Sequence, residues 1–265
     1  MKKCIINILK NKYFLAVSGI ILFFLIWEIV SLIINEPIMI FPDPFTTIGK
    51  AFEYLGKEYT YKCILGSLKK IGLGFLYAFA GAMFFGIIAG NSKYIQQLFH
   101  PTMVALKAIP TAAMVFVFLV LVGFNDAPIL IVVLMAFPIL YESVVAGFNN
   151  INDDIMDTLK LDNTGTLKKI FKVKVPLSFP YIIVGLASSF ALTFKVEIMA
   201  EIMTGGSDYG LGTIIQLERT YYHTSDMRPV FGYAFIAIMI ALLMSYLAYF
   251  LKKKLLKNVE TKKTT

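Results

Sequence analysis

The residues with the clearest chemical potential are ionisable side chains that interrupt long apolar runs. Glu197 and Glu201 stand four residues apart, and Lys195 lies two positions before the first of them. This spacing places both carboxylates on one face of a helix. A charge inside an apolar run is costly unless it faces protein or water, so a functional role is the default. For Glu201, such a role competes with that of an interfacial carboxylate that pairs with a neighbouring helix or is hydrated.

Motifs for catalysis are absent from the sequence. His100 and His223 are the only histidines, and there is no H-E-x-x-H, G-x-S-x-G or G-x-x-x-x-G-K-[ST] pattern. The two cysteines offer no metal-ligand spacing. We therefore expect no catalytic residue, metal or cofactor. A membrane-embedded enzyme that uses Glu142 or Glu201 as acid or base stays an alternative, but it lacks partner residues.

Composition indicates the class of protein. The 265 residues are 58% hydrophobic and 16% charged, with a mean hydropathy of +0.73, which is too apolar for a soluble domain. The net charge of +8 could suggest nucleic-acid binding, but the lysines and arginines lie in loops between apolar runs, which fits membrane topology better. The sequence predicts an all-α, polytopic membrane protein that contacts the lipid bilayer and no nucleic acid.

Six transmembrane helices fit the length. We expect a cytoplasmic N-terminus at 1–12, then a first span at 13–34 followed by an amphipathic helix on the outer surface, which together occupy 13–62. A core membrane domain should occupy 63–251, with spans at 64–90, 100–123, from the turn 125–128 to 148, 177–203 and 230–251. The segment 149–176 interrupts it as a soluble loop, and 252–265 form a cytoplasmic tail. Because the predicted inner segments hold more Lys and Arg than the outer ones, both termini should be cytoplasmic in the cell membrane.

Two features of the spans concern packing and bending. Small residues recur at every fourth position of the second span and should let another helix approach closely; they are Gly74, Ala78, Ala82, Gly86 and Gly90. Pro110 should kink the third span near Lys107, and Glu142 lies one turn inward of Pro138 in the fourth span. A kinked helix suits a protein in which that helix lines a path across the membrane that must open and close.

The soluble loop has the pattern of a helix–turn–helix. Asn152 or Asp153 can cap a first helix that carries an apolar stripe. We expect this helix to end at Asn163, which tolerates the left-handed conformation, and a second stripe to run from Leu167 until Pro176 closes it. A partner protein could cover the apolar side chains.

At these residues the sequence resembles the membrane-spanning subunits of binding-protein-dependent ABC importers. The family's E-A-A triplet, its Gly and its I-x-L-P ending align at the correct spacing with residues 157–159, 163 and 173–176. The resemblance implies a coupling helix that docks into a cleft of an ATP-hydrolysing subunit. The residues expected there are Ile155, Met156, Asp157, Thr158, Leu159, Asn163, Gly165 and Pro176.

Further motifs are similar to the nitrate, sulfonate and taurine branch of this family. They are F-P-x-P at 41–44, S-L-x-R-x-x-x-G at 67–74 with Lys70 in place of Arg, R-x-x-P ending at Pro110, and A-E followed by G-L-G. The candidate path and gate residues are Lys107, Pro110, Glu142, Lys195, Glu197, Glu201, Gly210, Leu211 and Gly212. On this interpretation, Glu201 helps to hold an outer gate.

The resemblance implies a type I ABC importer permease fold and a non-catalytic translocation subunit. Its partners would be an ATP-binding cassette ATPase, an extracytoplasmic substrate-binding protein and, most simply, a second copy of this chain. The cargo would be a small anion or a small polar organic nutrient of the nitrate, sulfonate, taurine or vitamin-precursor class. A stand-alone secondary transporter remains the alternative, supported by Lys195 and Glu197 but by no internal repeat.

Overall fold

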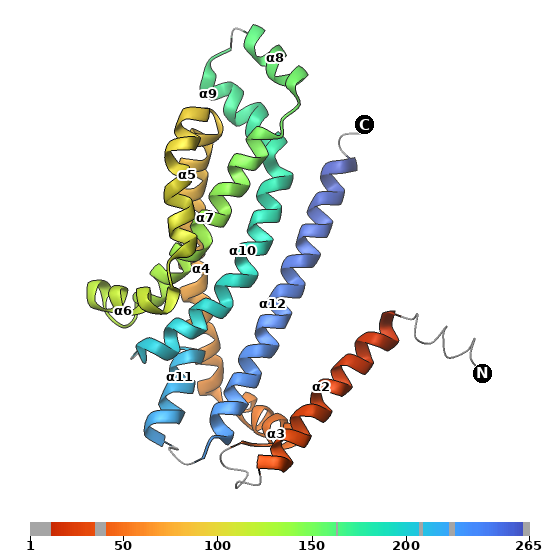
Figure 1. Ribbon diagram of the computed structural model, residues 1–265, viewed down its shortest axis with the longest axis vertical. Coiled ribbons are helices and arrows are strands. Elements are labelled where there is room, and N and C mark those ends of the chain that lie inside the picture. Colours follow the sequence, from red (N-terminus) through yellow and green to blue (C-terminus); the bar gives the residue numbers. More distant parts are fainter. Residues whose placement is uncertain (1–11, 35–40, 163, 207–208, 223–225, 262–265) are drawn as a thin grey trace, which may run out of the picture. The chain divides into compact units, whose positions relative to one another are not determined.

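The computed structural model describes residues 12–34, 41–162, 164–206, 209–222 and 226–261, and every regular element in these ranges is a helix (Figure 1). The chain divides into two compact units, residues 1–60 with 215–236 and residues 61–214 with 237–265. Five helices in the described ranges are long and apolar enough to cross a membrane, and a bent pair of helices could supply a sixth span. The predicted all-α membrane fold is therefore confirmed.

The first unit contains α2 (Lys12–Ile34) and the amphipathic helix α3 (Pro44–Leu55). The carboxylate of Asp43 caps α3, because it accepts hydrogen bonds from the Thr46 N–H at 2.5 Å and the Thr46 hydroxyl at 2.9 Å. Pro44 occupies the first turn, where its missing N–H costs nothing. The side chain of Tyr54 on the buried face of α3 stacks on Tyr233, with ring centroids 4.5 Å apart. The predicted amphipathic helix is thus present.

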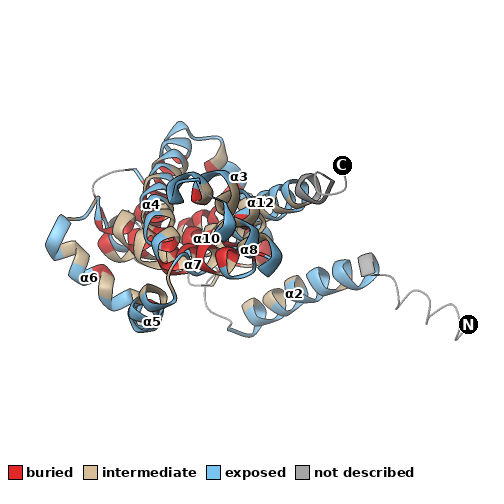
Figure 2. Ribbon diagram, turned by 90° about the horizontal axis from the view of Figure 1, so that it is seen from above, coloured by how far each residue is buried: buried red, intermediate tan, exposed pale blue. Residues whose placement is uncertain are grey.

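The second unit is built around α4 (Glu58–Gly90), α7 (Ala127–Asn149) and α10 (Val175–Thr204). Buried residues gather along α7 and α10, whereas the outward faces are exposed (Figure 2). The small-residue ridge of α4 packs on α7: a Cβ on Gly74 would lie 2.7 Å from Val132 Cβ, and one on Gly86 would lie 2.8 Å from Val144 Cβ. The predicted close approach is confirmed, since no larger residue fits at these positions.

The predicted third span is wrong in two respects. Its helix begins at Lys93 rather than near His100, and it is broken into α5 (Lys93–Ala108) and α6 (Thr111–Val122), which meet at 96°. The break has a local cause. The ring of Pro110 disfavours a helical conformation at the preceding residue, and Ile109 is indeed extended, with ψ of 128°. Pro110 therefore ends one helix and starts another, which is more than a kink.

The soluble loop forms α8 (Asp153–Leu161) and α9 (Thr166–Lys169), which we call the hairpin. Two boundaries differ from the prediction. The first helix ends at Leu161, because Asp162 is extended with ψ of 130°, and Asn163 lies outside the described residues. Pro176 does not close the second stripe, since residues 166–204 are helical without a break.

A π-helical segment, η1 (Ile170–Lys174), lets the chain pass through Pro176. The Val175 N–H bonds to the carbonyl of Ile170, five residues back. The wider turn moves the preceding carbonyls away from the proline ring, which would clash in a regular helix interior. Pro176 instead lies in the first turn of α10.

The C-terminal helix α12 (Arg228–Thr261) extends ten residues beyond the predicted end of the sixth span. It continues through Lys252, Lys253 and Lys254, so the first part of the predicted tail is helical. Lysine is a good helix former and can direct its amine towards water from an apolar surface. Two short elements between 205 and 227 were not predicted: α11 (Leu211–Leu217) and the π-helical η2 (Glu218–Tyr222).

Candidate functional site

A buried polar cluster surrounds Glu201 near the C-terminal end of α10. One carboxylate oxygen, Oε1, accepts a hydrogen bond from Lys70 Nζ at 2.8 Å. The other, Oε2, accepts from Ser67 Oγ at 2.7 Å and from the Gly212 N–H at 2.9 Å. The Glu201 side chain is fully buried and that of Lys70 is 8% exposed, so the ion pair is screened little by solvent.

Glycines allow this cluster to form. A Cβ on Gly210 would overlap the Glu201 carboxylate, and one on Gly212 would lie 2.6 Å from Glu201 Cβ. The Leu211 N–H donates to Ser67 Oγ at 2.8 Å. The 210–212 turn, whose last two residues begin α11, is thus fixed to α4 and α10 by hydrogen bonds to Ser67 and Glu201. Gly205, with φ of 59°, ends α10 in the left-handed conformation just after Glu201.

The structure therefore brings together four of the predicted gate residues: Glu201, Gly210, Leu211 and Gly212. It gives Glu201 the ion pair with a neighbouring helix that the sequence left as an alternative to a gate. Sequence reasoning missed the roles of Ser67 and Lys70, although both had been singled out within a motif. Their spacing of three residues on one helix face was the available signal.

Lys195 and Glu197 do not form a joint site. Lys195 is exposed, whereas Glu197 is fully buried one turn before Glu201. Within the described ranges, neither carboxylate oxygen of Glu197 has a hydrogen-bond partner. A buried polar atom without a partner is rare and costly. The charged pair that would support a secondary transporter is thus not assembled.

Lys107 and Glu142 do meet. Lys107 Nζ lies 2.6 Å from Glu142 Oε1, and the pair links the last turn of α5 to α7 next to the Pro110 bend. Both side chains are more than 40% exposed, so the interaction contributes about 1 kcal/mol at most. The pair can open at little cost.

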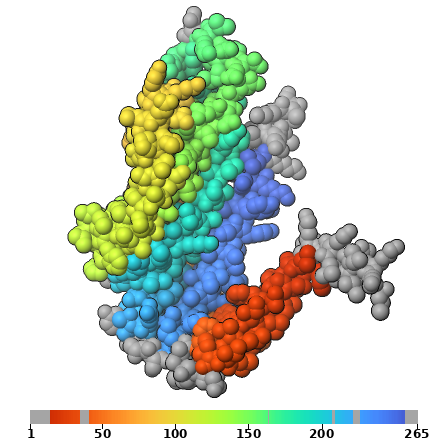
Figure 3. Space-filling view, in the orientation of Figure 1, coloured from red at the N-terminus to blue at the C-terminus, as the bar shows by residue number. Residues whose placement is uncertain are grey.

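The hairpin stands beyond the ends of α7 and α10 (Figures 1 and 3). It presents apolar side chains to solvent. Ile155, Met156 and Leu159 are half-buried in this chain alone. The most exposed apolar residues of the hairpin are Leu161, 85% exposed, which the first predicted stripe missed, and Leu167, 72% exposed, at which the second predicted stripe begins. Leu161 follows the predicted stripe by two residues, so helix periodicity did not include it.

Polar contacts fix the shape of the hairpin. Lys169 Nζ donates to the carbonyls of Leu159 at 2.6 Å and Asp162 at 2.5 Å, and so caps the end of α8. The Asp162 carboxylate accepts from the hydroxyl of Thr164 at 2.5 Å and from its N–H at 3.1 Å, and these bonds lower the pKa of Asp162. The two helices therefore have a defined relative orientation without a partner.

The remaining predicted coupling residues have local roles. Asp157 pairs with Lys160 at 2.7 Å, which raises the pKa of Lys160, and the Thr158 hydroxyl donates to the Asp154 carbonyl at 2.8 Å. Gly165 is the exposed residue before α9, with φ of −58°, so it has no need of glycine's freedom.

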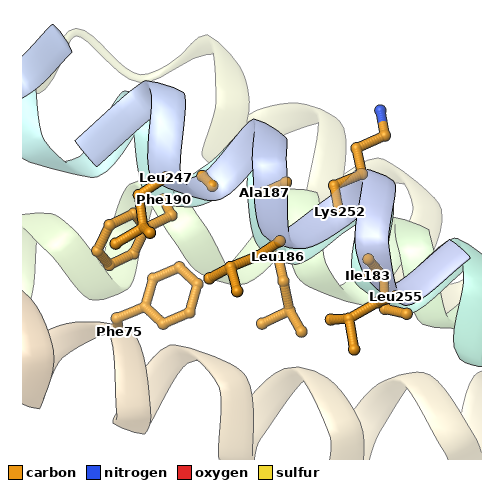
Figure 4. Close-up of a pocket in the computed structure, with 10 residues that line it drawn as sticks. Phe75, Ile183, Leu186, Ala187, Phe190, Leu247, Lys252 and Leu255 are labelled. Carbon is orange, nitrogen blue, oxygen red and sulfur yellow. The ribbon is translucent and has the colours of Figure 1, made fainter. Parts of the chain in front are cut away.

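Two pockets lie in the second unit. One, of about 240 Å³, is lined by apolar side chains of α4, α10 and α12, and the only charged side chain, Lys252, directs its amine away from the apolar floor (Figure 4). The other, of about 440 Å³, is polar and lies between α4, the start of α7 and Tyr209. Its lining consists of Lys62, Leu65, Gly66, Lys69, Lys70, Leu73, Asn125, Asp126, Ile129 and Tyr209.

Comparison with known proteins finds a transport family and several related permeases. Residues 82–259 match the family model described as "Binding-protein-dependent transport system inner membrane component". A putative aliphatic sulfonates transport permease, SsuC of Bacillus subtilis, is 25% identical over 88% of this chain and 83% of its own. The nitrate import permease NrtB of Synechococcus elongatus is 25% identical over 73% and 72%, respectively. The bicarbonate transport permease CmpB of Synechocystis is 25% identical over 75% and 74%.

The fold also matches a solved structure. A chain of the MetNI methionine ABC transporter in an inward-facing conformation superposes with a TM-score of 0.57, at 14% sequence identity, over 76% of this chain and 96% of that one. At this identity the likeness concerns the fold alone.

Proposed function

The chain belongs to the family of inner-membrane components of binding-protein-dependent transport systems, and from this premise we propose that it carries a small anion into the cell, driven by an ATPase that docks on the hairpin. It is a multi-pass permease subunit of an ABC importer, a translocation component and not an enzyme. The solute, the docking site and the assembly are the proposed parts.

The observation that carries the docking proposal is the apolar surface of the hairpin. In the hairpin, Leu161 and Leu167 are 85% and 72% exposed on a segment whose shape is already fixed by Lys169, and Phe171 of the adjoining η1 is 59% exposed. Clustered apolar side chains outside a membrane span are typical of a protein interface. The half-buried stripe of Ile155, Met156 and Leu159 would extend this surface.

The proposed solute class follows from the relatives. Their names specify sulfonates, nitrate and bicarbonate, all of which are small oxyanions. A small polar organic nutrient is the alternative within the same system. An extracytoplasmic binding protein would deliver the solute to the side of the 210–212 turn, with both chain termini and the hairpin in the cytoplasm. In this arrangement the Glu201 cluster holds the turn at the outer gate.

The mechanism we propose uses two copies of the permease around one path. Closure of two ATPases around ATP would draw the two hairpins together and turn the path outward as a rigid-body transition. The α5–α6 bend, with its weak Lys107–Glu142 pair, is the segment of each copy that could adjust at low cost.

The decisive experiment is reconstitution of the permease with its ATPase and its binding protein. Uptake of nitrate, methanesulfonate and bicarbonate is measured with ATP and with a non-hydrolysable analogue. We expect uptake of one anion that requires both ATP hydrolysis and the binding protein. Uptake that follows an ion gradient without ATP would instead identify a secondary transporter.

The docking site is tested by Leu161→Asp, with Leu161→Met as the matched control. An unpaired carboxylate in an apolar contact should weaken association with the ATPase by several kcal/mol, whereas methionine keeps volume and polarity. Co-purification of the two subunits measures the effect. Normal complex yield and ATP-driven uptake by Leu161→Asp would rule out the hairpin as the docking site.

A further inference from the structure

An apolar groove lies between α10 and the second half of α12, within the second unit (Figure 4). One wall is the face of α12 that carries Leu247, Leu251 and Leu255, which recur every fourth residue and so line up along the helix. Each of these leucines is between 40% and 47% exposed, although it lines a concave surface. The groove is therefore accessible from outside and is not filled by the protein itself.

The other wall of the groove is also apolar. Ile183, Ala187 and Phe190 share a face of α10 at spacings of four and three residues. The ring of Phe190 packs edge-to-face on Phe75 of α4, with ring centroids 5.3 Å apart. Figure 4 shows this aromatic pair beside Leu247, at one end of the groove. The side chains on both walls thus offer an occupant only apolar contacts.

A cation stands near the opposite end of the groove. Lys252 is the only charged residue among the described residues that line it, and Figure 4 shows its amine directed out of the groove on the side of Leu255. Lys252 is half-buried, whereas Lys253 and Lys254, on other faces of α12, are exposed. None of the three lysines pairs with a carboxylate of another described residue. The Lys252 ammonium is therefore available to an anion at the end of an apolar groove.

The length of the groove fits one leaflet of a bilayer. From Leu247 to Leu255 the helix advances by eight residues, which is about 12 Å at a rise of about 1.5 Å per residue. One leaflet accounts for half of a hydrocarbon core that is about 30 Å thick. A lipid acyl chain that lies along α12 would thus fill the groove and leave its headgroup near Lys252.

We propose that the groove binds an anionic glycerophospholipid, with one acyl chain along the leucines of α12 and the headgroup phosphate at Lys252. The ammonium group supplies up to three N–H donors to the phosphate oxygens, and its charge favours a headgroup with a net negative charge. A helix from a second copy of the chain fits less well, because helices in lipid approach one another through small residues and this wall of α12 is a row of leucines. The inference is independent of the proposed solute and docking site, since it uses no residue of either.

The test uses the full-length chain in nanodiscs made of equal parts of phosphatidylcholine and phosphatidylglycerol. After extraction in a mild detergent, native mass spectrometry counts the lipids that each chain retains and identifies their headgroups. Lys252→Gln removes the charge at the groove. Lys254→Gln is the matched control, because it removes the same charge two residues further on, about 160° around the same helix.

A second pair of variants tests the apolar part of the groove with every charge in place. Ala187→Phe adds volume at a residue that lines the groove. Val184→Phe adds bulk to the same helix at a position that is 39% exposed and does not line the groove. If Ala187→Phe does not fold, the two lysine variants still decide the question.

We expect the wild type, Lys254→Gln and Val184→Phe to retain phosphatidylglycerol with about tenfold preference over phosphatidylcholine, the effect of one hydrogen bond to a charged group. Lys252→Gln should retain both lipids without preference, and Ala187→Phe should retain neither.

Three results would overturn the inference. Equal loss of the preference in Lys252→Gln and Lys254→Gln would assign it to the diffuse positive charge of this part of α12. No preference in the wild type, or unchanged retention of phosphatidylglycerol by Ala187→Phe, would show that the groove is not the site. A wild-type dimer that carries no lipid and is dissociated by Ala187→Phe would show that a second copy of the chain covers the groove.

Discussion

At the scale of single residues, the fate of a buried charge depends on partners that lie far away in sequence. Glu201 could be recognised from its position in an apolar run, and the Gly210–Gly212 turn from its motif. Lys70 could not be assigned as its partner, because 131 residues separate the two and periodicity carries no information about such pairs. Glu197 lies on the same helix face as Glu201 and is equally buried, yet its carboxylate oxygens have no hydrogen-bond partner in the described ranges.

The Lys70–Glu201 pair should behave as a unit. Glu201→Gln or Lys70→Met alone leaves one buried group without its counter-charge, and breaking a buried pair costs about 3–5 kcal/mol. The double variant removes both charges and should be more stable than either single variant. Thermal unfolding of the purified permease in detergent measures this. If the loss of thermal stability in the double variant equals the sum of the losses in the two single variants, the two side chains do not interact.

Glu201→Gln also tests the gate. If the carboxylate holds the 210–212 turn, the variant should lose stimulation of ATPase activity by the loaded binding protein, measured in reconstituted vesicles. Ser189→Ala is a control, because Ser189 is buried in α10 but bonds only to carbonyls of its own helix among the contacts described. Unchanged stimulation and uptake in Glu201→Gln would reduce the cluster to a structural anchor.

At the scale of elements, the sequence predicted helices better than their ends. Apolar runs and small-residue spacing depend on local composition, and they located α4, α7 and α10. The π-helical segment at 170–174 and the broken helix at 109–110 depend on how a proline is accommodated, which composition does not determine. Of the hairpin's two exposed leucines, Leu167 was part of the predicted second stripe, whereas Leu161 was missed because it follows the first stripe by two residues, out of helical spacing.

The α4–α7 contact should tolerate no added volume. Gly86→Leu would force a side chain into Val144 and should lower the yield of folded protein, with overpacking costs of about 1–3 kcal/mol or more. Gly72→Leu is the control on the same helix, since no atom lies within 4 Å of a Cβ there. Yield and melting temperature are measured for both. Equal values would place the glycine ridge against lipid.

The 96° bend should depend on Pro110. Pro110→Ala restores an N–H that can bond to the Leu106 carbonyl and frees Ile109 to become helical. Spin labels at the exposed positions Leu98 and Val120 should then move apart to about 33 Å, the length of an unbroken helix. We expect uptake to fall as well. A shorter distance that persists would show that packing, not the proline, maintains the bend.

At the scale of the whole molecule, composition was sufficient for the fold class, because a chain this apolar has few alternatives to a helical membrane bundle. The assembly requires measurement. We expect native mass spectrometry of the complex to give two copies of this chain and two ATPase subunits. A mass corresponding to one copy, or to one copy with a different permease, would contradict the proposed homodimer.

The π-helical segment before Pro176 sets the rotational phase between the hairpin and α10. A widened turn accommodates one more residue than a regular one, and each residue of an α-helix advances the direction of a side chain by about 100°. The widened turn at Ile170–Lys174 absorbs its extra residue, whereas one further residue inserted between Lys169 and Ile170 would have no such turn to absorb it and would swing Leu161 and Leu167 by about that angle around the axis of α10. The apolar surface would stay intact but face a different direction. The chain should therefore still fold and insert into the membrane, but it should no longer bind the ATPase.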